Sequence, residues 1–127
     1  MGTTVLIVDD HATFRSSARL LLESEGFEVV GEAADGGSAI KQAAALSPDL
    51  LLLDVQLPDI DGFEVTSRLA AAGPGPAVIL VSSRDGRDFG PLVQASGARG
   101  FVAKAELSGE RLRALLDAPT QPETSSR

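Results

Sequence analysis

The sequence contains no cysteine, tryptophan or tyrosine, and only five of its 127 residues are aromatic, all of them phenylalanine. Without cysteine there is no disulfide, no thiolate metal site and no thiol nucleophile, so any catalysis must use oxygen groups. The scarcity of aromatic rings argues against a platform on which nucleic-acid bases would stack. Thiol chemistry and single-strand nucleic-acid binding are therefore set aside.

Long apolar segments are also missing. The strongest apolar runs span four or five residues, far short of the roughly twenty that cross a bilayer, so the chain is expected to be soluble. Eleven basic against eighteen acidic residues give a net charge of −7, which opposes the attraction that dominates nucleic-acid binding. The first residues enter an apolar run with no basic leader. A cytoplasmic location is therefore expected, without direct contact to a nucleic acid or a membrane.

The apolar runs that are present predict a sheet. Those at 5–8, 50–53 and 78–81 are continuous rather than alternating, which is typical of strands covered on both faces. Weaker runs at 27–30 and 100–103 suit strands nearer an edge. Amphipathic helical spacing lies between the runs. Strictly alternating strands and helices predict a doubly wound α/β domain, with a parallel sheet and helices on both faces.

The predicted helices have recognisable ends. Gly26, Ser47-Pro48 and Gly73-Pro74 follow the first three, and Ser108 is the expected N-cap of the last. The fourth helix is expected to be short, because the proline of Gly90-Pro91 is tolerated in a first turn but not in a helix interior.

The chain length suits one domain with one core. We assign this domain to residues 1–117. Residues 118–127 are rich in Pro, Ser and Thr without apolar periodicity, so they are expected to be a disordered tail or a truncated linker.

Polar side chains follow the predicted strands. Asp9-Asp10 follow the first, Asp54 the third, Ser82 the fourth and Lys104 the fifth. In an open α/β sheet these ends meet at the rim where ligands bind. Carboxylates about 4 Å apart would repel by roughly 4 kcal/mol per pair at an effective dielectric of 20. They therefore require a cation.

The ligand chemistry favours a particular ion. All-oxygen ligands with room for water and phosphate favour Mg²⁺, with Mn²⁺ as a substitute. A carboxylate beside Mg²⁺ and an ammonium can attack a phosphoryl donor. Asp54 would then become an aspartyl phosphate, while Lys104 and the Ser82 hydroxyl contact the phosphoryl oxygens.

These residues resemble those of the receiver domain of bacterial two-component response regulators. In that family an acidic pair follows the first strand and the phospho-acceptor ends the third, within a segment like Asp54 to Gly62 here. A Ser or Thr after the fourth strand matches Ser82, and an aromatic residue three before a lysine matches Phe101 and Lys104. The resemblance covers residues 4 to 117. It implies a flavodoxin-like fold with strand order 2-1-3-4-5.

The resemblance also implies roles that spacing does not reveal. Gln56 would lend its backbone carbonyl to the metal, which Asp9, Asp10 and Asp54 also hold. Ser82 and Phe101 would change position on phosphorylation. The face made by the fourth helix, fifth strand and fifth helix would then pass the change to an output domain or partner protein.

Further implications concern lifetime and partners. Gln56 and Arg84 occupy places that in the family tune the lifetime of the phosphoryl group. A sensor histidine kinase would be the donor. Asp10-His11 and the stretch 97–101 resemble the subclass that precedes a helix-turn-helix output domain, which implies control of transcription. A homodimer is consistent with the family, although the sequence has no signature of one.

One departure from the family concerns the residue after the lysine. Family members often have proline there in a cis peptide bond, whereas this chain has Ala105. We expect a trans bond and a differently arranged loop.

Alternative readings of the site residues remain open. Asp9-Asp10 could be a helix-capping pair, Lys104 a surface lysine and Phe101 a core residue. His11 is a weak metal-ligand candidate, since a single imidazole at a helix start more often faces solvent.

Alternative functions remain open as well. An aspartyl-nucleophile phosphatase would need a second acid where Gln56 stands, so this chain is not expected to be an enzyme. A phosphorylation-independent interaction module would keep the same fold. A nucleotide-binding domain is disfavoured, because the sequence has neither a Gly-x-Gly-x-x-Gly nor a Walker A motif.

Overall fold

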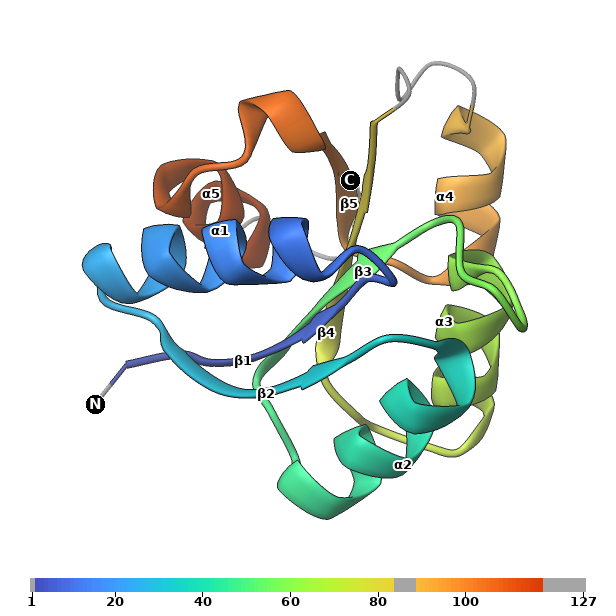
Figure 1. Cartoon of the computed structure of the whole chain (residues 1–127). Helices are drawn as coiled ribbons and strands as arrows, with labels where there is room; N and C mark the ends of the chain where they lie inside the picture. The colour runs from blue at the N-terminus through green and yellow to red at the C-terminus, as the bar shows by residue number, and fades with distance from the viewer. Residues whose placement is uncertain (1, 84–88, 118–127) are drawn as a thin grey trace.

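Strands and helices alternate along the chain in the computed structural model, which describes residues 2–83 and 89–117 (Figure 1). The predicted tail at 118–127 lies outside the described residues, and so does Arg84, which was predicted to tune the lifetime of the phosphoryl group. In chain order the elements are β1 (Thr4–Val8), α1 (Ala12–Ser24), β2 (Glu28–Ala33), α2 (Gly36–Leu46), β3 (Leu50–Asp54), α3 (Gly62–Ala71), β4 (Ala77–Ser82), α4 (Gly90–Ser96), β5 (Gly100–Ala103), the 3₁₀ turn η2 (Lys104–Glu106) and α5 (Gly109–Asp117).

The five strands form one parallel sheet in the order β2-β1-β3-β4-β5. The predicted fold class and strand order are confirmed. The three strands with the most continuous apolar runs lie inside the sheet, and the two weaker ones are its edges. From β1 the chain adds β2 on one side of the sheet, and it then adds β3, β4 and β5 on the other side. The strand order therefore reverses between β1 and β3, and the carboxyl ends of these two strands flank the crevice where such folds bind ligands.

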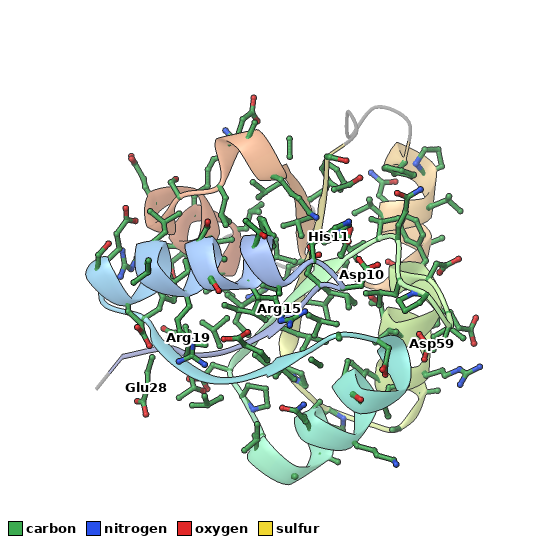
Figure 2. All side chains as sticks on the ribbon, viewed as in Figure 1. Asp10, His11, Arg15, Arg19, Glu28 and Asp59 are labelled. Atoms are coloured by element: carbon green, nitrogen blue, oxygen red, sulfur yellow. The ribbon has the colours of Figure 1, made fainter. Side chains whose placement is uncertain are left out.

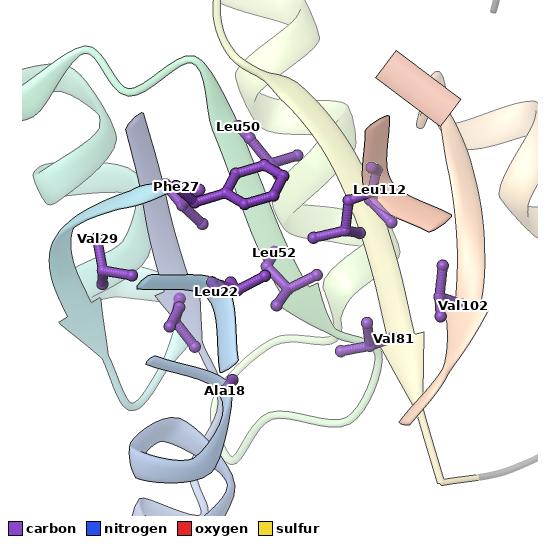
Figure 3. Packing of buried hydrophobic residues seen from close by; sticks show 12 residues of the cluster. Ala18, Leu22, Phe27, Val29, Leu50, Leu52, Val81, Val102 and Leu112 are labelled. Carbon is purple, nitrogen blue, oxygen red and sulfur yellow. The ribbon is translucent and has the colours of Figure 1, made fainter. Parts of the chain in front are cut away.

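A hydrophobic cluster covers each face of the sheet. Leu50 and Leu52 point toward the face that α1 and α5 cover, and Leu51 and Leu53 point toward the face of α2, α3 and α4. Figure 3 shows the first cluster, with side chains from the central strands packed against those of α1 and α5. All four leucines are fully buried, and each such burial contributes roughly 1.5–3 kcal/mol. This two-sided burial explains why the strand sequences do not alternate.

Local side-chain chemistry sets the helix ends. Asp35, Asp61 and Ser108 each accept a hydrogen bond from a backbone N–H in the first turn of α2, α3 and α5, respectively. Beyond their C-terminal ends, Gly26 after α1 and Ser47 after α2 adopt the left-handed conformation, with φ of 94° and 47°. The predicted stops and the predicted Ser108 cap are confirmed. None of the described helices has both the length and the hydropathy to span a membrane.

The fourth helix and the bond after Lys104 have the expected structural form. α4 has seven residues and carries Pro91 in its first turn. No described peptide bond is cis, so Lys104 and Ala105 are joined by a trans bond, and they begin the 3₁₀ turn η2.

The second strand is longer than predicted. The expected strand ended at Val30, but β2 continues to Ala33 after a register shift opposite Val5 and Leu6. The sequence Gly31-Glu32 interrupts the apolar run, so hydrophobicity alone ends the strand too early. Backbone pairing with β1 continues the strand regardless of side-chain polarity.

Candidate functional site

The ends of four strands bring the predicted site residues to one edge of the sheet. Asp9 follows β1, Asp54 ends β3, Ser82 ends β4 and Lys104 follows β5. Because all strands are parallel, their carboxyl ends point the same way. Ligand atoms of Asp9, Asp10, His11 and Asp54 all lie within 4.8 Å of one another.

The two central carboxylates are buried. The exposed fraction is 0% for Asp9 and 3% for Asp54. Oδ1 of Asp54 accepts a hydrogen bond of 3.3 Å from the backbone N–H of Gln56. Oδ2 of Asp9 is buried and has no hydrogen-bond partner in the described part of the chain. Two carboxylates in this environment require positive charge, because burying an unpaired charge is costly.

Lys104 supplies that positive charge. Its Nζ lies 2.6 Å from Oδ2 of Asp9 and 3.5 Å from Oδ2 of Asp54, and the side chain is only 16% exposed. The Asp9 contact is thus an ion pair rather than a hydrogen bond. The Lys104 side chain is therefore largely buried against two carboxylates, unlike that of an ordinary surface lysine.

The environment of Asp54 favours its protonated form. Burial, and after it the negative charge of Asp9, raise the pKa of Asp54 to about 6. The ammonium of Lys104 and the N–H of Gln56 oppose this rise. The charged form of the Asp54 carboxyl is thus destabilised in the folded protein.

His11 contacts both residues of the acidic pair. Its Nδ1 lies 3.0 Å from Oδ1 of Asp9 and 3.1 Å from Oδ1 of Asp10, while the ring is 67% exposed. Its backbone N–H donates to Oδ1 of Asp9 at 2.8 Å. His11 itself occupies the N-cap position of α1, and no side chain caps it. The acidic pair therefore does not cap the helix in the usual way.

Arg15 anchors the loop that carries the acidic pair, a role that the sequence reading missed. Its Nη1 donates to the backbone carbonyl of Asp9 at 2.6 Å, and its Nε pairs with Glu32 of β2 at 3.0 Å. Arg19 binds the other carboxylate oxygen of Glu32 at 2.8 Å, which lowers the pKa of Glu32. Figure 2 shows both arginines on the side of α1 that faces β2. The i, i+4 spacing of the arginines was the available signal, but their partner lay beyond the predicted end of the second strand.

The loop after Asp54 is fixed by two further carboxylates. Asp59 accepts hydrogen bonds of 2.8 and 2.9 Å from the N–H groups of Gly36 and Gly37 at the start of α2. These bonds lower the pKa of Asp59 to about 2. Asp61 caps α3 instead. Neither residue belongs to the acidic cluster, and Asp59 instead joins the loop after β3 to the start of α2.

The predicted relay residues lie on the β4–β5 side of the site. Ser82 is 1% exposed and pairs in register with Ala103, next to Lys104. Phe101 is half-buried and packs with the α2, α3 and α4 cluster. Its ring lies 5.9 Å from that of Phe89, which lies 5.7 Å from that of Phe63. Phe101 thus packs as part of the hydrophobic core and also lies beside the site.

A cavity of about 550 Å³ lies away from these residues. It is lined by the C-terminal ends of α2 and α3 and by the loop 73–76, and Arg68 is its one charged lining residue. It therefore lacks the paired ionisable groups of the strand-end rim.

The residues at the rim fit a hard divalent cation. Three carboxylates supply oxygen ligands, and the buried Asp9 Oδ2 has no hydrogen-bond partner among the described residues. Mg²⁺ is held by carboxylate oxygens and retains water and phosphate ligands. Asp9, Asp10 and Asp54 match that donor set.

Comparison with known proteins identifies relatives along nearly the whole chain. The family model of the response regulator receiver domain matches residues 5–117. The transcription regulator BvgA of Bordetella pertussis is 41% identical over 106 residues, covering 84% of this chain and 51% of that protein. The response regulator GacA of Pseudomonas aeruginosa is 36% identical over 112 residues, covering 87% of this chain and 52% of that protein. The chain thus spans about half the length of these relatives.

Solved structures agree with the family match. The signal receiver domain of the response regulator NarL from Mycobacterium tuberculosis superposes with a TM-score of 0.83 at 30% identity. The superposition covers 92% of this chain and 98% of that domain.

Proposed function

The chain belongs to the response regulator receiver family, and from this we propose that it is a phosphoryl-accepting signalling switch whose acceptor is Asp54. The observation that carries the proposal is the position of Lys104, whose ammonium lies between the buried carboxylates of Asp9 and Asp54. An ammonium and a cluster of carboxylates at strand ends suit the transfer of a charged phosphoryl group.

In the proposed reaction a carboxylate oxygen of Asp54 attacks the phosphorus of a phosphohistidine on a sensor histidine kinase. An O–P bond forms, the N–P bond breaks, and the leaving imidazole nitrogen keeps the electron pair. The product is an aspartyl phosphate. Lys104 then holds one phosphoryl oxygen by charge, and the Ser82 hydroxyl donates a hydrogen bond to another.

The proposed metal ligands are Asp9, Asp10, Asp54 and the backbone carbonyl of Gln56. Bound Mg²⁺, or Mn²⁺ in its place, would neutralise charge on the oxygens of the group being transferred. The side chains of Gln56 and Arg84 are proposed to tune the lifetime of the product.

The proposed output path starts at Ser82 and Phe101. The phosphorylated side chain carries about −1.5 to −2 charges at neutral pH in place of the single charge of the carboxylate, which attracts the hydroxyl and the ammonium toward Asp54. The row of rings from Phe101 through Phe89 to Phe63 connects β5 with α4 and α3. Movement along this row would alter the α4-β5-α5 face, which is the proposed contact for an output domain or partner protein.

The proposed cellular setting follows that of the relatives. BvgA is a transcription regulator and GacA is a response regulator. We therefore propose that this chain acts in the cytoplasm and controls transcription through an output domain or partner protein. A homodimer of this chain is part of the same proposal. The chain itself, with a net charge of −7, would not contact DNA.

Intact-mass measurement after incubation with acetyl phosphate and Mg²⁺ tests the acceptor. Wild-type protein should gain one phosphoryl group, with acetate as the leaving group. Asp54→Asn should gain none. Asp61→Asn is the matched control and should still be labelled, because Asp61 caps α3 outside the acidic cluster. Equal labelling of Asp54→Asn and wild type would refute the assignment, and no labelling of either would favour a phosphorylation-independent module.

A further inference from the structure

The ring of Phe14 lies against the ammonium of Lys104. Nζ of Lys104 is 4.5 Å from the ring centroid. Phe14 belongs to the first turn of α1, whereas Lys104 begins η2 at the other end of the chain. The two residues therefore meet only because α1 and η2 lie on the same side of the strand-end rim. Neither composition nor spacing indicated this contact.

The phenylalanine is held in place on two sides. Its ring is half-buried and packs against the hydrophobic cluster that α1 and α5 share. The next residue, Arg15, is bonded to the carbonyl of Asp9 and to Glu32. The backbone that carries the ring is thus tied to the loop that carries the acidic pair. The ring offers a fixed surface to the ammonium.

An aromatic face attracts the ammonium without competing for its hydrogen-bond partners. Lysine has a flexible four-carbon stem and three rotatable N–H donors. The negative face of the ring attracts the cation electrostatically and leaves its N–H groups available to oxygen atoms. An aliphatic side chain of similar size would fill the same space but would only remove water from the cation. Phe14 thus suits a lysine that has to exchange one oxygen partner for another.

We propose that Phe14 is a positioning residue that holds the Lys104 ammonium at the rim and guides it from Asp9 toward the phosphoryl group on Asp54. This role rests on the proposed function, because it assumes that Asp54 is the acceptor. The contact between ring and ammonium, however, is a property of the unphosphorylated protein. It can be measured separately from the reaction.

Nuclear magnetic resonance of ¹³C-labelled lysine tests the contact. The chain has two lysines, Lys41 and Lys104, and Lys41 is exposed on α2, so it serves as an internal reference. The ring current of Phe14 should shift the ε-methylene protons of Lys104 upfield of those of Lys41. Phe14→Leu should abolish this difference, whereas Phe14→Tyr should retain it. Urea unfolding of both variants confirms that the folded state is being compared.

The rate of labelling by acetyl phosphate tests the consequence. Phe14→Leu should slow phosphorylation by about threefold to tenfold, as expected for the loss of a partly desolvated cation–π contact. Phe14→Tyr should stay within about twofold of wild type, because it keeps the aromatic face. Equal slowing in both variants, or unchanged lysine signals in Phe14→Leu, would overturn the positioning role. No labelling of wild type would overturn the proposed function alone, and the lysine signals would still decide whether the ring holds Lys104.

Discussion

The buried carboxyl of Asp54 is predicted to make the metal-free protein less stable at neutral pH than in mild acid. Burial raises its pKa from 3.8 to about 6, so the folded state favours the protonated form. The resulting stabilisation of the folded state is fully present below the pKa that Asp54 has in the unfolded chain. It is lost as the pH rises through the pKa that Asp54 has in the folded protein. The window therefore runs from about pH 4 to pH 6.

The variant Asp54→Asn keeps the shape of the carboxyl but carries no charge. A pKa difference of about two units corresponds to roughly 3 kcal/mol, so the variant should be more stable than wild type by up to about that amount at pH 7.5. By the same linkage relation the advantage should fall to about 1 kcal/mol at pH 4.5.

Urea unfolding in the presence of a chelator measures both values. Glu28→Gln is the control, because Glu28 is an exposed carboxyl of β2 without an ion pair in the described part of the chain. Adding Mg²⁺ should stabilise wild type selectively and narrow the gap at pH 7.5. A stability difference between Asp54→Asn and wild type that is the same at both pH values would refute the reasoning.

Two further substitutions test the framework of the site. Gly62→Ala should lower the free energy of unfolding by about 1–3 kcal/mol and reduce labelling of Asp54, because the added Cβ would lie 2.5 Å from the Asp54 carbonyl oxygen. Gly90→Ala is the control, because nothing lies within 4 Å of the added Cβ there. Its urea midpoint should not fall. Arg15→Lys should lower the free energy of unfolding by about 1–2 kcal/mol, since an ammonium cannot reproduce the fork that binds both a carbonyl and Glu32. An Arg15→Lys midpoint equal to wild type would show that the fork contributes nothing.

The sequence predicted the members of the site because the strand ends determine them. Once 5–8 and 50–53 are recognised as buried parallel strands, the residues that follow them must lie at one edge of the sheet. Asp9, Asp54 and Lys104 were found in this way. The same reasoning gave the sheet order only with the help of a family resemblance, since alternation of strands and helices does not by itself order the strands.

The supporting contacts could not be predicted, because they join residues distant in sequence. Asp59 binds the start of α2, and Oε1 of Glu25 accepts a bond of 2.6 Å from the N–H of Gly109, at the start of α5. Glu32 was missed because β2 extends past the apolar run. Hydrophobic periodicity reports which face is buried, and it carries no information about which polar side chains meet across elements.

The position of Lys104 also determines what the proposed switch must do. At an effective dielectric of 20, its attraction to Asp9 at 2.6 Å is about 6 kcal/mol and to Asp54 at 3.5 Å about 5 kcal/mol. The resting lysine is therefore attracted somewhat more strongly by Asp9 than by Asp54. A phosphorylated Asp54 would carry about −1.5 to −2 charges in place of the single charge of the carboxylate, which would reverse this preference. Since Lys104 directly follows β5, the transfer pulls on the strand that carries Phe101, and the first movement of the switch would pass along β5.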